Sequence, residues 1–139
     1  MQTISEDIRK KILLFQETEI TEYHIYKRLA KRINSVENAK ILDQIAEDEL
    51  RHYNGWKEYT NEEVQPRWFF VWFYYLVSIL FGFTFGVKLM EMGEEKAQVN
   101  YEAVSKVIPQ ATQYQDEEDK HEHQLIEMVK NSDRAVIPM

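Results

Sequence analysis

Two segments of the chain repeat the pattern Glu-x-x-His, at residues 49–52 (Glu-Leu-Arg-His) and 118–121 (Glu-Asp-Lys-His). On an α-helix, residues three apart share a face, so each segment directs a carboxylate and an imidazole to the same side. Mixed carboxylate and imidazole ligands suit Fe(II) and Mn(II), whereas structural zinc sites favour thiolates or several histidines. The repeat therefore predicts a metal site built from two helices.

In a glutamate-rich chain, a single Glu-x-x-His is weak evidence for a metal site. The prediction is stronger here because the residues of both patterns lie on the apolar faces of their predicted helices. Core-type positions recur at steps of three and four residues in four segments, the period of bundle helices. An unpaired charge at such a position costs roughly several kcal/mol, and no Lys or Arg shares the phase to form an ion-pair network. The four segments and the polar side chains on their apolar faces are 8–33 (Glu19, Glu22), 38–59 (Glu49, His52), 83–108 (Glu94) and 111–128 (Glu118, His121).

Together these side chains form the ligand set of a di-iron or di-manganese carboxylate site. We expect two iron ions, with manganese as the alternative. Glu49 and Glu118 would bridge the ions, and one more glutamate and one histidine would complete the ligands of each. Glu22 would be a seventh ligand or a nearby base. The candidate metal ligands are Glu19, Glu22, Glu49, His52, Glu94, Glu118 and His121.

Other polar residues near these segments receive a different interpretation. Tyr26 and Tyr101 occupy equivalent places in the two halves and are expected to be core aromatics, with a redox or hydrogen-bonding role beside the metal as the alternative. His24 and His123 lie off the apolar faces and are not expected to be ligands. Several acidic residues also lie off these faces and are expected to be solvated: Glu17, Glu47, Asp48, Glu91, Glu95, Asp116, Glu117, Glu122 and Glu127.

The four segments predict an all-α fold, a four-helix bundle with one long crossover of the kind that ferritin-type bundles have. Thr3 or Ser5 could cap the first helix and Ser35 the second, and Pro109 ends the third. The first and third helices carry matching spacings of Glu and Tyr, which indicates an internal repeat and a pseudo-twofold axis. A chain of 139 residues suits a single domain, 1–139.

The link between the two helix pairs is the one ambiguous segment. Trp68 to Val87 contains no charged residue and meets the length of about 20 residues required for a membrane span. A span here would place the two halves of the repeat on opposite sides of a bilayer, so we expect a crossover over about Pro66 to Leu80, with Gly82 and Gly86 allowing a bend or close packing. The aromatic excess from Trp68 to Tyr75 then predicts a dimer interface or contact with a membrane surface.

Composition excludes several classes of protein. The chain has no cysteine, so disulfides, thiolate zinc sites, iron–sulfur clusters and a rubredoxin-type iron centre are ruled out within it. A net charge of −7 disfavours nucleic acid as a partner. The first residues are polar and acidic rather than basic and then apolar, so we expect a cytoplasmic protein, or one at the cytoplasmic face of a membrane.

The Glu-x-x-x-x-x-x-Tyr and Glu-x-x-His spacings resemble those of the rubrerythrin branch of the ferritin-like superfamily. More closely, residues 83–95 and 117–122 resemble the ferritin-like domain fused to membrane iron transporters of the vacuolar iron transporter type. This resemblance implies a homodimer that oxidises Fe(II), or reduces peroxide or dioxygen, at a di-iron centre. A non-catalytic iron-binding sensor, or a module that delivers iron to a transporter, is the alternative.

The chain departs from that family pattern in two ways. Rubrerythrins carry a further glutamate where this chain has Ala97, while Glu22 stands at the equivalent place in the first helix. They also usually bring a rubredoxin-type electron donor, which needs cysteine. We therefore expect the two metal positions to be unequal, and the chain to be either a stand-alone member or an excised domain.

Overall fold

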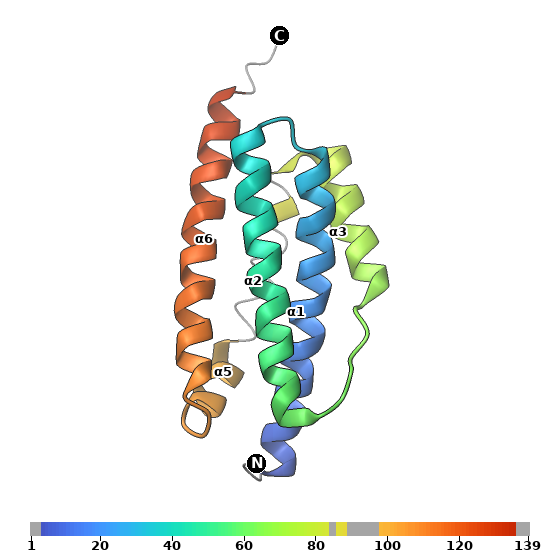
Figure 1. Cartoon of the computed structure of the whole chain (residues 1–139). Coiled ribbons are helices and arrows are strands. Elements are labelled where there is room, and N and C mark those ends of the chain that lie inside the picture. The colour runs from blue at the N-terminus through green and yellow to red at the C-terminus, as the bar shows by residue number, and fades with distance from the viewer. Residues whose placement is uncertain (1–3, 84–85, 89–97, 136–139) are drawn as a thin grey trace.

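The computed structural model describes residues 4–83, 86–88 and 98–135, and the regular secondary structure within them is entirely helical. The all-α prediction is confirmed. Helices α6, α2, α1 and α3 lie side by side in that order, and α5 packs against α6 and α1 at one end (Figure 1). The helices are α1 (Glu6–Arg32), α2 (Val36–Thr60), α3 (Trp68–Phe81), α5 (Gln98–Ser105) and α6 (Gln110–Ala135).

Serine caps begin the first two helices. The Ser5 side chain accepts a hydrogen bond from the Ile8 N–H, and Ser35 accepts one from the Asn38 N–H, each at 3.2 Å. Each bond satisfies one of the amide groups that the first turn of a helix leaves free. Ser35 is confirmed as a cap, and Ser5 rather than Thr3 caps α1, with Thr3 outside the described residues.

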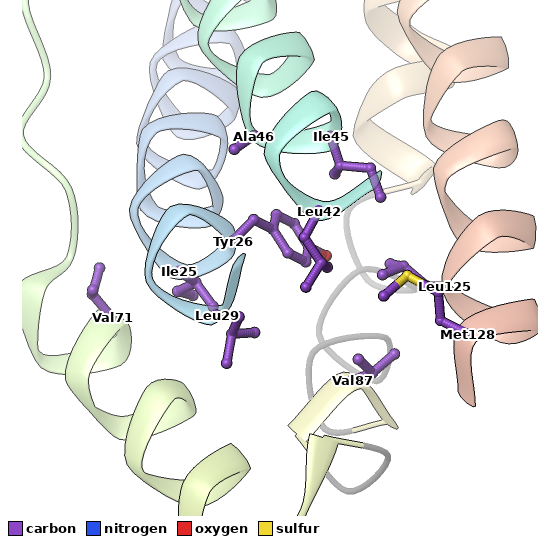
Figure 2. Close-up of a cluster of buried hydrophobic side chains, with 10 residues drawn as sticks. All are labelled: Ile25, Tyr26, Leu29, Leu42, Ile45, Ala46, Val71, Val87, Leu125 and Met128. Carbon is purple, nitrogen blue, oxygen red and sulfur yellow. The ribbon is translucent and has the colours of Figure 1, made fainter. Parts of the chain in front are cut away.

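Two hydrophobic clusters lie at different heights of the α1–α2–α6 group. The first, shown in Figure 2, joins residues of α1, α2, α3 and α6 with Val87. The second joins α1, α2 and α6 with the segment 104–108. In α1, α2 and α6 the polar site residues fall in sequence between the members of these two clusters. The second cluster consists of Ile12, Phe15, Trp56, Val104, Ile108, Ala111 and Tyr114.

The predicted crossover forms helix α3, which packs on α1. It ends at Gly82, whose φ of +101° is a backbone conformation that other residues rarely adopt. A Cβ at Gly86 would overlap the Ser78 side chain, so close packing at this glycine brings the chain back against α3. Both glycine predictions are confirmed. Within the described residues, no helix combines the length and the apolar character that crossing a bilayer requires.

The third predicted helix is described only at its two ends. Residues 86–88 and 98–105 are helical, while Glu94 and Ala97 lie outside the described residues. Helix α5 ends at Ser105, not at Ile108 as the pattern predicted. The backbone tightens before Pro109, where the Val107 and Ile108 N–H groups both donate to the Val104 carbonyl, at 2.9 and 2.8 Å.

Candidate metal centre

Four predicted ligands from three helices converge. Glu19 of α1, Glu49 and His52 of α2, and Glu118 of α6 each offer an atom, and these atoms all lie within 4.8 Å of one another. His52 Nδ1 lies 3.3 Å from an oxygen of Glu19, 3.3 Å from one of Glu118 and 3.8 Å from one of Glu49. Glu19, Glu49 and His52 are buried and Glu118 is partly buried. This cluster could hold a metal ion.

Several polar atoms of the cluster are buried without a hydrogen bond. Both carboxylate oxygens of Glu49, one oxygen of Glu118 and the His121 Nδ1 have no hydrogen-bond partner. A buried polar atom left in this state costs about 1–3 kcal/mol, and more when it is charged. The atoms are oxygens and imidazole nitrogens, the ligand types that divalent iron and manganese accept, so the cluster fits such a cation.

His121 lies at the edge of the same cluster and mirrors His52. The Nδ1 of His121 is 3.2 Å from Glu49, and the Nδ1 of His52 is 3.3 Å from Glu118. Each histidine thus faces the glutamate of the other Glu-x-x-His segment. These two contacts exchange the histidines and glutamates of the two segments.

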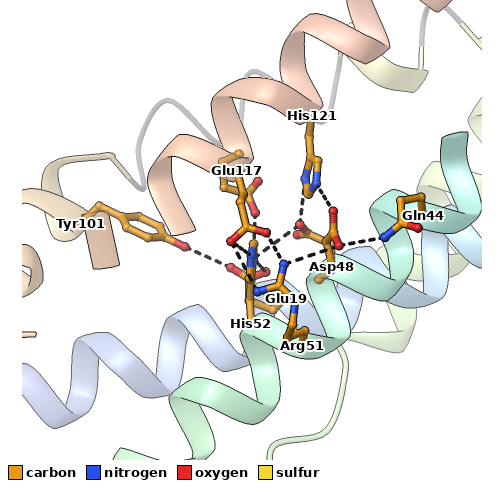
Figure 3. A network of polar contacts seen from close by, with 10 residues as sticks. Glu19, Gln44, Asp48, Arg51, His52, Tyr101, Glu117 and His121 are labelled. Atoms are coloured by element: carbon orange, nitrogen blue, oxygen red, sulfur yellow. Dashed lines mark hydrogen bonds and ion pairs between the residues drawn. The ribbon is translucent and has the colours of Figure 1, made fainter. Parts of the chain in front are cut away.

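The Nε2 atoms of the two histidines also lie near acidic residues of the other Glu-x-x-His helix. His121 Nε2 lies 2.8 Å from Asp48, within hydrogen-bonding distance, and His52 Nε2 lies 3.4 Å from Glu117 (Figure 3). A carboxylate behind an imidazole fixes the orientation and tautomer of the ring and raises its basicity as a ligand. The two halves differ in these distances, and Arg51 pairs with both acids, more closely with Glu117 than with Asp48.

The interpretation of Asp48 and Glu117 as solvated surface acids is therefore wrong. Partial burial opposes ionisation of Asp48, but hydrogen bonds from His121 and Gln44 lower its pKa. A signal was present in the sequence, since each acid directly precedes the glutamate of a Glu-x-x-His segment. The other described acids of that group are exposed, or, in the case of Glu17, partly exposed beside Arg67.

Crowding of carboxylates dominates the electrostatics of the metal-free cluster. Burial and the charges of Glu118, Glu19 and Glu22 raise the pKa of Glu49 well above its ordinary value. Burial and the charge of Glu118 likewise raise the pKa of Glu19. Burial alone would lower the pKa of His52, but hydrogen bonds to Glu118 and Glu19 raise it to about 10. Without a cation, the cluster therefore retains protons.

Glu22 and the two predicted tyrosines occupy different surroundings. Glu22 is buried, and its charge helps to raise the pKa of Glu49. The Tyr101 hydroxyl donates to Glu19 at 3.0 Å, which places Tyr101 beside the cluster. Tyr26 lies in the first hydrophobic cluster, as Figure 2 shows. Of the predicted ligands, the structure brings together all except Glu94, which lies outside the described residues.

Aromatic rings cover one side of the cluster. Tyr114 lies against His52, with ring centres 4.3 Å apart, and Trp56 meets Tyr114 edge-on at 5.1 Å. Phe15 stacks on Tyr101 at 4.3 Å and contacts Trp56. Nothing in the sequence pattern indicated that Tyr114 would contact a ligand. These rings hold His52 in place and reduce access of water from this side.

A cavity of about 330 Å³ lies between α5 and α6. Tyr101 lines it and also donates to Glu19, so this residue links the cavity to the cluster. Its other lining residues are mostly polar: Glu102, Ser105, Ala111, Thr112, Gln115 and Asp119.

Comparison of the chain with protein-family models, with curated proteins and with solved structures finds no match.

Proposed function

We propose that this chain is a di-iron carboxylate protein of the rubrerythrin-like, ferritin-like type that oxidises Fe(II) with peroxide or dioxygen. The observation that supports the proposal is the buried cluster of Glu19, Glu49, His52 and Glu118, whose unpartnered oxygens need a cation. No Lys or Arg is recorded in contact with the Glu19, Glu49 and Glu118 carboxylates within the described residues, so a metal ion is the better source of positive charge.

The proposed ligand assignment follows the crossed geometry. Glu19 and His52 would bind one ion, and Glu49 and Glu118 would lie between the two positions. His121 would bind the second ion together with Glu94, which is assigned from its spacing in the sequence alone. The helix that carries Glu94 would complete a four-helix bundle with α1, α2 and α6.

When bound, two ferrous ions would supply two electrons, enough to reduce one hydrogen peroxide to two waters. The surrounding residues would prepare the site for this reaction. Tyr101 holds the Glu19 carboxylate by its hydrogen bond and borders the cavity through which a small oxidant could approach. The raised pKa values of Glu49 and Glu19 mean that these groups give up protons as a cation binds.

Anaerobic titration with Fe(II), followed by measured additions of hydrogen peroxide, tests the proposal. We expect two Fe(II) bound per chain and two oxidised per peroxide, followed by near-ultraviolet ferric absorption. Glu49→Ala should abolish both binding and absorption. Glu58→Ala, which removes an exposed glutamate of the same helix, should change neither. Absence of an iron-dependent spectrum in the unaltered chain would contradict the proposed chemistry.

A second candidate function is a non-catalytic module that binds iron and delivers it to a membrane transporter. The exposed aromatic face of α3 favours it, because this face offers a docking surface separate from the metal cluster. The same titration separates the two functions. A delivery module would bind Fe(II) reversibly and release it to a chelator, with little consumption of peroxide.

A further inference from the structure

One face of helix α3 is apolar and uncovered in the described structure. Its buried residues are Val71, in the first hydrophobic cluster, and Ser78, which faces Gly86. The opposite face leaves between 40% and 75% of each apolar side chain exposed. A patch of this kind on a water-soluble surface marks an interaction site. Its residues are Trp68, Phe69, Trp72, Phe73, Leu76, Ile79 and Leu80.

Cationic side chains border this face. The Arg28 guanidinium of α1 lies over the rings of Trp68 and Trp72, at 5.5 and 5.0 Å. Arg67, at the start of α3, lies 4.5 Å from the centre of the Phe70 ring and pairs with Glu17 of α1 at 3.4 Å. Arg28 donates to the His24 carbonyl and makes no ion pair within the part of the chain that the structure describes. From residue 64 to residue 90 the chain has no acidic residue.

The acidic part of the molecule lies on the far side. Helix α6, which carries a dense group of acidic residues, and α3 are at opposite edges, with α2 and α1 between them (Figure 1). Helix α3 packs mainly on α1, whereas α6 packs on α2 and α5. The Debye length is about 8 Å in physiological salt, so exposed acidic residues farther than this from α3 have little effect on a surface that contacts it.

We propose that α3 docks on an anionic lipid membrane surface. Trp and Phe rings partition into the boundary between headgroups and acyl chains, and guanidinium groups beside them reach the phosphates. α3 runs alongside α1, so docking would lay the long axis of the helix group along the membrane (Figure 1). The metal cluster, which lies among α1, α2 and α6, would remain accessible from the aqueous side.

A second copy of this chain could also cover the apolar face of α3. In a symmetric dimer the same surface meets itself, so Arg28 and Arg67 of both copies would enter one interface. Segment 64–90 supplies no acidic residue to pair with them, and within the described residues Glu17 of α1, which pairs with Arg67, leaves Arg28 without an acidic partner. An anionic bilayer supplies both a nonpolar environment for the rings and phosphates for the cations, so charge complementarity favours it.

Co-sedimentation of the full chain with vesicles tests this proposal. The vesicles are pure phosphatidylcholine, or phosphatidylcholine with about 30% phosphatidylglycerol, at low and high salt. We expect partitioning about fivefold stronger on the anionic vesicles, as one unpaired arginine near the surface would give, and a marked loss in about 0.5 M salt. The triple change Phe69→Gln, Trp72→Gln and Leu76→Gln should abolish binding, and Arg28→Gln should weaken it severalfold.

A matched control removes three exposed apolar residues elsewhere, Leu14→Gln, Val36→Gln and Val107→Gln, and should bind as the unaltered chain does. Circular dichroism and Fe(II) titration of each variant show that the fold and the metal cluster persist, so the result is independent of the proposed oxidation chemistry. Equal binding to neutral vesicles, or no binding, would overturn the proposal. The proposal would also be overturned if light scattering showed a dimer that the triple change in α3 dissociates.

Discussion

At the scale of single residues, the metal-free cluster has too little positive charge for its buried carboxylates. Glu19, Glu49 and Glu118 share a buried volume, and the nearest groups that can carry positive charge are the imidazoles of His52 and His121. Two imidazoles cannot neutralise this many carboxylates. The metal-free protein must therefore keep protons on the cluster, and those protons are the means by which metal binding and stability depend on pH.

The stability of the metal-free protein should fall as the pH rises. The pKa of His52 is raised from 6.5 to about 10, so its contribution is fully present below pH 6.5 and is lost as the pH approaches 10. The raised pKa of Glu49 acts in the same direction, because ionising this buried acid costs free energy in the folded state. Urea unfolding in the presence of a chelator should show a decrease on the order of a few kcal/mol over that range.

His52→Gln provides the control for this pH dependence, because it removes the titrating imidazole while keeping a polar side chain of similar length. Its unfolding free energy should be lower at pH 6.5 and should change less between pH 6.5 and 10. A metal-free stability that rises with pH in the unaltered chain would show that these groups do not carry the protons we assign to them.

Asp48 and Glu117 should contribute unequally to metal affinity. Asp48→Asn removes the carboxylate bonded to His121 and should weaken Fe(II) binding about 10- to 100-fold. Glu117→Gln should have a smaller effect, because Glu117 lies 3.4 Å from His52, whereas Asp48 lies 2.8 Å from His121. Competition with a calibrated chelator measures both affinities, and the exposed Glu122→Gln serves as the control. Equal affinities in all three variants would contradict these roles.

At the scale of the helices, periodicity predicted the part of the structure that depends on burial. The steps of three and four placed Glu19, Glu49, His52, Glu118 and His121 on buried or partly buried faces, and the structure confirms this. Ser35 was predicted as a cap, and Gly82 as a place for a bend or close packing, because both features depend on local chemistry.

Contacts across helices were beyond this kind of prediction. Asp48 lies off the apolar face of α2, and its burial depends on His121, which is far away in the sequence. The end of α5 was misplaced because Ile108 is buried without being helical. Burial alone does not distinguish the last residue of a helix from a residue in a buried turn. The position of Pro109 does, because proline disfavours the helical conformation at the residue before it.

Gly55 tests the contact between α2 and α6. A Cβ there would overlap the Tyr114 hydroxyl and come within 3.0 Å of its ring carbon Cζ. Tyr114 cannot easily move, because its ring lies against His52 and Trp56. Gly55→Ala should therefore destabilise the protein by about 1–3 kcal/mol, although alanine is the better helix former by about 1 kcal/mol.

The double variant Gly55→Ala with Tyr114→Phe removes the overlapping oxygen and should recover most of that loss in urea unfolding. A double-mutant cycle isolates the overlap from the loss of the hydroxyl itself. If Gly55→Ala cost the same with phenylalanine at position 114, the close approach of α6 to this glycine would not be the cause.

At the scale of the whole molecule, the carboxylate cluster divides the helix group into two hydrophobic parts. Helix α6 contributes Ala111 and Tyr114 to one part and Leu125 and Met128 to the other, with Glu118 between them. Repulsion between Glu49 and Glu118 across the α2–α6 contact helps to raise the pKa of Glu49, so a proton must relieve it in the metal-free protein. A bound cation reverses that repulsion, so α6 should be the helix whose stability depends most on metal.

Removal of metal should therefore loosen α6 more than α1 or α2. Hydrogen exchange measured by mass spectrometry should show faster exchange in segments 111–128 after chelation, with little change in the segments of α1 and α2 that contact each other. A metal present at about 1,000 times its dissociation constant stabilises the folded state by about 4 kcal/mol, so the melting temperature should fall by roughly 10 °C on chelation. In Glu118→Gln, which weakens both the repulsion and the metal site, exchange in α6 should respond little to chelation. A uniform change over all helices would instead indicate that metal stabilises the fold as a single cooperative unit.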